Sequence, residues 1–193
     1  EKGLVFAEGP LVAGRLVESR FPVRAIYGFG GRLESFLQDY GEELERRQIP
    51  VYEITRKIMG EVAGYDMHRG LLASADKAPE RSVAEVLDGA RTLVILEGVG
   101  DHENIGSIFR NAAGMGVDGV LFGAATADPL YRRSVRVSMG HVLRTPFAHL
   151  EGTTTTWQRS LQELKDDGWW LVSLTPADDA VLLREAVEDH LSL

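Results

Sequence analysis

The sequence predicts an α/β protein in two parts, a small α/β domain followed by a larger domain built on a parallel sheet. Apolar, β-rich runs alternate along the chain with segments in which apolar residues recur every three or four positions. The composition is that of a globular protein, with 44% hydrophobic and 26% charged residues. A polar stretch at 76–90 interrupts the alternation, so we place domains at 1–78 and 91–193, with a linker at 79–90.

The first domain is expected to alternate strands with helices. Its strands are predicted at 4–7, 23–29, 50–54 and 70–75, and its helices at 10–19, 33–44 and 56–63. Pro10 suits a first helical turn because its missing N–H has no helical partner there. Thr55 is of a residue type that caps helices, and Gly30 with Gly31 ends the second strand.

The second domain opens with a strand, a glycine-bearing loop and a helix. The strand is predicted from Thr92 to Leu96, the loop at 97–100, and the helix from Asn104 onward. The apolar face of the helix comprises Ile105, Ile108, Phe109, Ala112 and Ala113, and the opposite face comprises Asn104, Ser107, Arg110, Asn111 and Gly114. A second strand at 119–122 completes a βαβ unit, whose parallel strands would bind a ligand at their carboxyl ends.

Further elements are predicted on both sides of this unit. The linker leads into a short helix at 83–87, and Asp128 with Pro129 has the residue types of an N-cap and a first helical position. Arg144 is expected in a strand that precedes Pro146. The last predicted elements are a helix at 157–164, a strand at 169–174 and a helix at 178–187.

Composition excludes several classes of function. The chain has no cysteine, and its five histidines do not have metal-ligand spacing, so we expect neither thiol chemistry nor a metal site. We find no apolar stretch of membrane-spanning length and no signal-peptide pattern, and therefore expect a cytoplasmic protein. The net charge of −8 argues against a nucleic-acid partner. However, residues 91–150 carry 6 basic and 5 acidic groups, residues 151–193 carry 3 and 9, and all the central bases are arginines, which suit phosphate recognition.

The run LEGVGDHENIGSIFRNAAGMGVDGVLF resembles the first signature motif of the SpoU (TrmH-type) ribose methyltransferases, which belong to the trefoil-knotted SPOUT class. The segment DPLYRRSVRVSMGHVLRTPF is similar to the one that follows in that family. The phrases FAEGPLVAGRLVES and HRGLLAS are similar to parts of the L30e-like RNA-binding domain that many SpoU enzymes carry in front of the catalytic domain. The resemblance implies a SPOUT fold preceded by an L30e-like domain.

The resemblance also implies an activity: transfer of a methyl group from S-adenosylmethionine to a ribose 2′-hydroxyl in structured RNA. Ribosomal RNA is favoured over transfer RNA as substrate, the protein would be a homodimer, and no metal would be needed. The family pattern makes Arg110 and Asn104 the catalytic candidates. Arg110 would position the phosphate beside the 2′-hydroxyl or, once deprotonated, accept its proton. Asn is also among the best helix caps, so Asn104 has a purely structural alternative.

The expected RNA contacts are Arg132, Arg133, Arg136, Arg144, His68 and Arg69. A solvated helix face is the alternative for the arginines, because most surface charges have no specific partner. His102 and His141 have no partner at motif spacing. In this family the cofactor is held chiefly by backbone groups of the C-terminal loops, to which only Leu174 and Thr175 could belong here.

The family would continue with G-x-E-G-x-G-L, I-P-M and S-L-N segments, and none follows here. We therefore expect a SPOUT domain that is incomplete at its C-terminus. A non-catalytic RNA-binding or assembly protein that has kept the fold without a complete cofactor site is the first alternative. A different anion-binding α/β enzyme is the second, but it would need a constellation of acid, base and nucleophile that we do not find.

Overall fold

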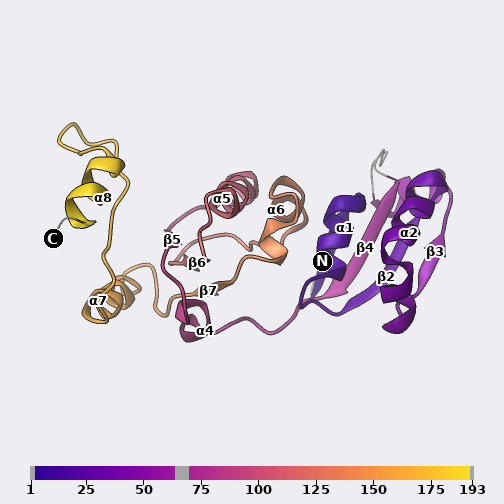
Figure 1. Cartoon of the computed structure of the whole chain (residues 1–193), viewed down its shortest axis with the longest axis horizontal. Coiled ribbons are helices and arrows are strands. Elements are labelled where there is room, and N and C mark those ends of the chain that lie inside the picture. The colour runs from indigo at the N-terminus through magenta and orange to yellow at the C-terminus, as the bar shows by residue number, and fades with distance from the viewer. Residues whose placement is uncertain (1–2, 64–69, 192–193) are drawn as a thin grey trace. The chain divides into compact units, whose positions relative to one another are not determined.

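The computed structural model describes residues 3–63 and 70–191 (Figure 1). The chain divides into two compact units, residues 1–157 and residues 158–193, and each is described by itself. The first unit contains two sheets with their helices, and the second contains helices only among its described residues. The α/β class expected from the alternating pattern is confirmed.

The first sheet is mixed and has the strand order β1-β4-β2-β3. Its strands are β1 (Leu4–Glu8), β2 (Val23–Gly28), β3 (Val51–Glu53) and β4 (Leu71–Asp76). Strand β4 runs antiparallel to both β1 and β2, whereas β2 and β3 are parallel. The helices between them are α1 (Pro10–Val17), α2 (Gly30–Arg46) and α3 (Arg56–Ala63). All seven elements lie where the sequence predicts them, with boundary shifts of a few residues.

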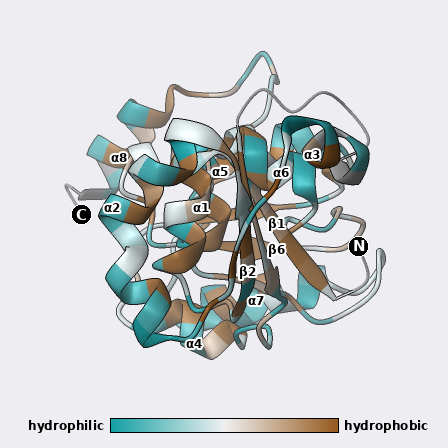
Figure 2. Ribbon diagram, turned by 90° about the vertical axis from the view of Figure 1, so that its right-hand side faces the viewer, coloured by the Kyte–Doolittle hydropathy of each residue, from teal (hydrophilic) through white to brown (hydrophobic). Residues whose placement is uncertain are grey.

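Helix α1 is the element of the first sheet that contributes most to the site described below. It begins at Pro10 and follows Gly9, whose φ of 84° is a conformation that glycine adopts without strain. Most of its side chains are buried, and Gly14 gives Tyr40 of α2 the room to pack against it. Figure 2 shows hydrophobic residues along the strands, whereas α2 alternates between hydrophobic and hydrophilic residues.

The second sheet is fully parallel and has the order β5-β6-β7. Its strands are β5 (Leu93–Leu96), β6 (Gly119–Phe122) and β7 (Phe147–His149). The helical segments around them are α4 (Val83–Leu87), α5 (His102–Gly114), α6 (Arg132–Val137) and the 3₁₀ turn η1 (His141–Leu143). Phe109 of α5 packs against Phe122 and Phe147 with ring centroids about 6 Å apart, which anchors the helix on the sheet. The predicted parallel βαβ unit is confirmed.

One buried core extends through both sheets of the first unit. The same cluster of apolar side chains includes Val5 and Ile26 in the first sheet and Phe122 and Phe147 in the second. The linker expected at 79–90 lies inside this unit, and the two-domain division stays a prediction. Among the described residues, no helix combines the length and apolar character that spanning a bilayer requires.

Three predicted elements differ from the structure. The helix expected at Asp128 begins only at Arg132, because the Asp128 carboxylate accepts the Leu130 N–H and holds a turn there. Arg144 lies after η1 and not in a strand. The segment 169–174 is not a strand, since it pairs with no other strand among the described residues.

The second unit contains α7 (Gln158–Asp166) and α8 (Leu183–Leu191). The predicted helix at 157–164 is therefore found with small shifts. The helix predicted at 178–187 begins later, because Ala180 closes a turn onto the Ala177 carbonyl instead of starting a helix. Trp170 stacks on His190 with ring centroids 4.1 Å apart, which places part of the apolar segment 169–174 against α8.

Candidate functional site

The loop after β5 leads directly into the capped N-terminus of α5. The Asp101 side chain caps this helix, because its Oδ1 accepts the N–H groups of Glu103 at 2.6 Å and Asn104 at 3.3 Å. The capping role considered for Asn104 is therefore wrong: Asn104 is the third residue of the helix, and its side chain is exposed. The Asn104 side chain is left available for a ligand.

Helix α5 presents the two expected faces. Ile105, Phe109 and Ala112 are buried, whereas Asn104 and Arg110 are exposed. Arg110 forms no ion pair with any residue that the structure describes. An unpaired guanidinium on an exposed helix face is free to bind an anion.

Helix α6 lies very close to α5 because Gly106 has no side chain. A Cβ at Gly106 would lie 2.8 Å from the Ser134 carbonyl oxygen of α6. The buried Ser134 hydroxyl donates to the His102 carbonyl at 3.0 Å, which ties α6 to the first turn of α5. This contact fixes the position of η1, which follows α6 directly and lies against α5.

The charges of three arginines from separate segments act on His141 of η1. Burial lowers the pKa of His141 below its usual value, and the positive charges of Arg15, Arg144 and Arg110 lower it further. Arg15 of α1 is held in place, because its Nη1 donates to the Met139 carbonyl at 2.6 Å. These arginines from α1, α5 and the η1 loop therefore produce one region of positive potential around His141. We call Arg15, Arg110, His141 and Arg144 the His141 cluster.

The arginines of α6 differ in their partners. Arg132 forms an ion pair with Glu8, whose side chain is only 3% exposed. Arg133 pairs with Glu103 at 2.6 Å, and both side chains are about half exposed. Arg136 is half-buried. Arg144 lies 3.7 Å from Glu18, a separation at which the pair is weak.

The expected RNA contacts thus occupy different surroundings. The structure places Arg144 in the His141 cluster with Arg110, while Arg132 and Arg133 have carboxylate partners of their own. His68 and Arg69 lie outside the described residues. The roles of all these residues in RNA binding stay predictions. Nothing in the local sequence around Arg15 signals its place in the cluster, because the turn that it joins lies 124 residues away.

The surface that carries Arg110 coincides with the part of the chain that matches a known family. Residues 91–190 match the model of the SpoU rRNA methylase family, which is more than half of the chain. The chain belongs to this family.

The SpoU chain is similar to curated relatives over more than this segment. It is 48% identical over 186 residues to an uncharacterized tRNA/rRNA methyltransferase, Rv0881, of Mycobacterium tuberculosis, covering 96% of this chain. It is 30% identical over 168 residues to the 23S rRNA (guanosine-2′-O-)-methyltransferase RlmB of Bordetella pertussis, covering 83% of this chain. The chain spans 62% of the length of the mycobacterial relative and 66% of that of the Bordetella enzyme.

Solved structures agree with the fold. The AdoMet-bound rRNA methyltransferase of Sinorhizobium meliloti superposes with a TM-score of 0.67 at 21% identity, over 82% of this chain and 59% of that chain. A structure described as an RNA 2′-O ribose methyltransferase superposes with a TM-score of 0.69 at 21% identity, over 93% of this chain and 66% of that chain. The SPOUT-type α/β fold is thereby shown for this SpoU chain.

S-adenosylmethionine is the cofactor of the SpoU family. The two residues expected to touch it, Leu174 and Thr175, lie in the second unit, and their role in cofactor binding stays a prediction. Leu174 is 80% exposed and Thr175 is also exposed, in a segment of the second unit that pairs with no strand. A binding pocket should enclose most of a ligand of this size, so these residues by themselves do not form one.

Proposed function

We propose that the protein methylates a ribose 2′-hydroxyl in structured RNA, and that ribosomal RNA is preferred over transfer RNA. The observation that carries this proposal is the His141 cluster, in which the charges of Arg110 and two further arginines act on one histidine, and Arg110 has no ion pair among the described residues. Three cations without an equal number of carboxylates favour binding of phosphates. The printed function of the Bordetella relative, methylation of a guanosine 2′-oxygen in 23S rRNA, supports the same chemistry.

Each residue of the site has a defined task in this proposal. Arg110 binds the phosphate next to the target ribose, because its planar guanidinium can donate two hydrogen bonds to phosphate oxygens. Arg15 and Arg144 keep the region positive, and the lowered pKa keeps His141 neutral near pH 7. The Asn104 side chain can accept or donate a hydrogen bond to the sugar. S-adenosylmethionine supplies the methyl group, and a homodimer would complete the site.

An RNA-binding or assembly protein without methyl transfer is the second candidate. In this candidate the exposed residues Leu174 and Thr175 belong to no cofactor site. Calorimetric titration of S-adenosylmethionine into the protein separates the two candidates. Saturable binding supports the enzyme, whereas a folded protein that binds RNA and no cofactor supports the alternative.

The proposed function is tested by methyl transfer from labelled S-adenosylmethionine to 23S ribosomal RNA transcribed without modifications. We expect Arg110→Ala to slow the transfer about 100-fold or more, as loss of a positioned hydrogen-bond donor does, with unchanged cofactor affinity. Arg91→Ala is the matched control, because it removes an exposed arginine that does not belong to the His141 cluster. No transfer by the wild-type protein, or equal rates for the wild type and Arg110→Ala, would contradict the proposal.

A further inference from the structure

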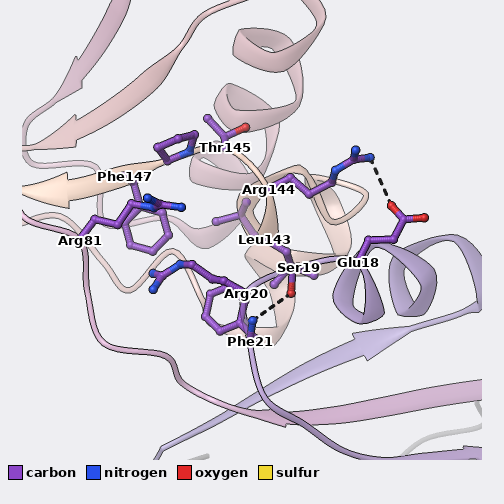
Figure 3. A pocket seen from close by; sticks show the side chains of 11 residues that line it. Glu18, Ser19, Arg20, Phe21, Arg81, Leu143, Arg144, Thr145 and Phe147 are labelled. Carbon is purple, nitrogen blue, oxygen red and sulfur yellow. Dashed lines mark hydrogen bonds and ion pairs between the residues drawn. The ribbon is translucent and has the colours of Figure 1, made fainter. Parts of the chain in front are cut away.

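A pocket of about 240 Å³ opens where the end of α1, the segment before α4 and the loop between η1 and β7 meet (Figure 3). Its charged lining consists of Arg20, Arg81, Arg144 and Glu18. Figure 3 shows the side chains of Arg20 and Arg81 extending into the same part of the pocket, while Arg144 extends toward Glu18. Three arginines and a single carboxylate make the lining positive.

Arg20 and Arg81 are close enough to repel one another. Burial lowers the pKa of Arg20, and the positive charge of Arg81 lowers it further. Arg81 forms no ion pair within the described part of the chain. Bringing two like charges together costs free energy unless an anion lies between them. The arrangement is therefore complementary to a negatively charged ligand.

The carboxylates near the two arginines have hydrogen-bond partners of their own, although the charges of Glu85 and Glu80 still raise the pKa of Arg20 in part. Glu80 accepts hydrogen bonds from the backbone N–H of His149 at 2.8 Å and contacts its Nδ1 at 2.5 Å. Glu85 accepts from the backbone N–H of Ser82 in a capping box. Glu18 accepts from the Tyr40 hydroxyl at 2.8 Å. These contacts reduce the competition of the protein's own acids for the pocket.

Arg20 is held in position before any ligand arrives. Its guanidinium lies 5.0 Å from the ring centre of Phe21, which is itself buried, and its Nη1 donates to the Pro79 carbonyl. A side chain that is already fixed loses little conformational entropy on binding. The pocket is therefore a preorganised site and not a set of freely moving surface arginines.

We propose that this pocket binds a phosphate of the RNA backbone, at a nucleotide other than the one that is methylated. The proposal rests on the proposed function and deepens it. Arg144 links the pocket to the His141 cluster, because it lines the pocket and also belongs to this cluster with Arg110. In this proposal an RNA strand bound at Arg110 continues past Arg144, and a further phosphate of that strand binds between Arg20 and Arg81. Two guanidiniums can each donate paired hydrogen bonds to its oxygens.

The test is the salt dependence of binding to unmodified 23S ribosomal RNA, measured by filter binding. Each lost phosphate contact should reduce the slope of log affinity against log salt by about 0.7 to 0.9. We expect the double variant Arg20→Gln, Arg81→Gln, which loses this one phosphate contact, to reduce it by about 0.8 and to weaken binding about tenfold or more. The double variant Arg91→Gln, Arg159→Gln loses the same charge at exposed sites outside the pocket and should keep the slope.

The single variant Arg81→Gln is a control for misfolding, because Arg81 has no ion pair to lose among the described residues. It should weaken RNA binding and reduce the slope by no more than the double variant does. Unchanged slope and affinity in both pocket variants, with intact wild-type RNA binding, would overturn only this inference. Saturable binding of inorganic phosphate that RNA does not displace would overturn the assignment to RNA. A wild-type protein that binds no RNA would overturn the proposed function as well.

Discussion

The arginines of this protein differ in whether their guanidinium group is paired with a carboxylate. Arg132 is held by the buried Glu8 and Arg133 by Glu103. Arg110 lacks such a partner within the described residues, and its surroundings are made more positive by Arg15 and Arg144. A guanidinium that is already paired must give up a carboxylate before it binds phosphate. Arg110 has no carboxylate partner among the described residues to lose when it binds phosphate.

The two polar residues at the start of α5, Asp101 and Asn104, have separate roles. We expect Asp101→Ala to lower the free energy of unfolding by about 1 kcal/mol, because two backbone N–H groups lose their acceptor. Asn104→Ala should leave the stability almost unchanged and slow methyl transfer, since its exposed side chain caps nothing. Urea denaturation with the transfer assay measures both effects. The reverse pattern, with Asn104→Ala as the destabilising change, would show that the cap is assigned wrongly.

The packing of α5 against α6 determines the position of η1 and of the residues of the His141 cluster that it carries. The close approach of the two helices depends on Gly106, which faces the Ser134 carbonyl and the Val137 side chain. Because both contacts belong to one short helix, a displacement of α6 would also move η1, and with it His141 and Arg144. The geometry of the cluster is therefore a property of this helix pair.

We expect Gly106→Ala to destabilise the protein by about 1 to 3 kcal/mol, because the new Cβ would lie 2.8 Å from backbone and side-chain atoms of α6. Gly114→Ala is the matched control in the same helix, since a Cβ there meets nothing within 4 Å and alanine favours a helix. Thermal and urea denaturation of both variants measure the difference. Equal stabilities would mean that α5 and α6 are not tightly packed at Gly106.

Within the first unit, an ion pair joins the first sheet to helix α6 in addition to the shared core. Glu8 ends β1, Arg132 begins α6, and the two lie 124 residues apart in the sequence. Glu8 is almost fully buried, so its charge needs this partner. The pair contributes more to holding the two segments in one arrangement than an exposed pair could.

We expect Glu8→Ala to cost about 3 kcal/mol of unfolding free energy, because it leaves Arg132 without its buried partner. Glu103→Ala removes the half-exposed partner of Arg133 and should cost less than about 1 kcal/mol. Arg132→Met combined with Glu8→Leu should recover part of the loss, since no charge is then left buried. Similar costs for Glu8→Ala and Glu103→Ala in urea denaturation would contradict this view of the pair.

The sequence by itself determined the local elements and the family. Hydrophobic periodicity located the parallel unit of β5, α5 and β6, and the same periodicity placed Arg110 and Asn104 on its exposed face. These features depend on residues a few positions apart, which a single sequence displays directly. Periodicity failed at 169–174, because a strand needs a neighbouring strand as well as an apolar composition.

Only the tertiary structure decided which charges meet. Arg15 reaches the Met139 carbonyl, Arg132 reaches Glu8, and Arg20 lies beside Arg81, although each pair is separated by 60 or more residues in the chain. Such contacts arise from the packing of α1 and α6 on the two sheets and leave no local pattern. Coulomb interactions depend on distance in space, so the sequence could name the arginines but could not show which ones form ion pairs with carboxylates and which do not.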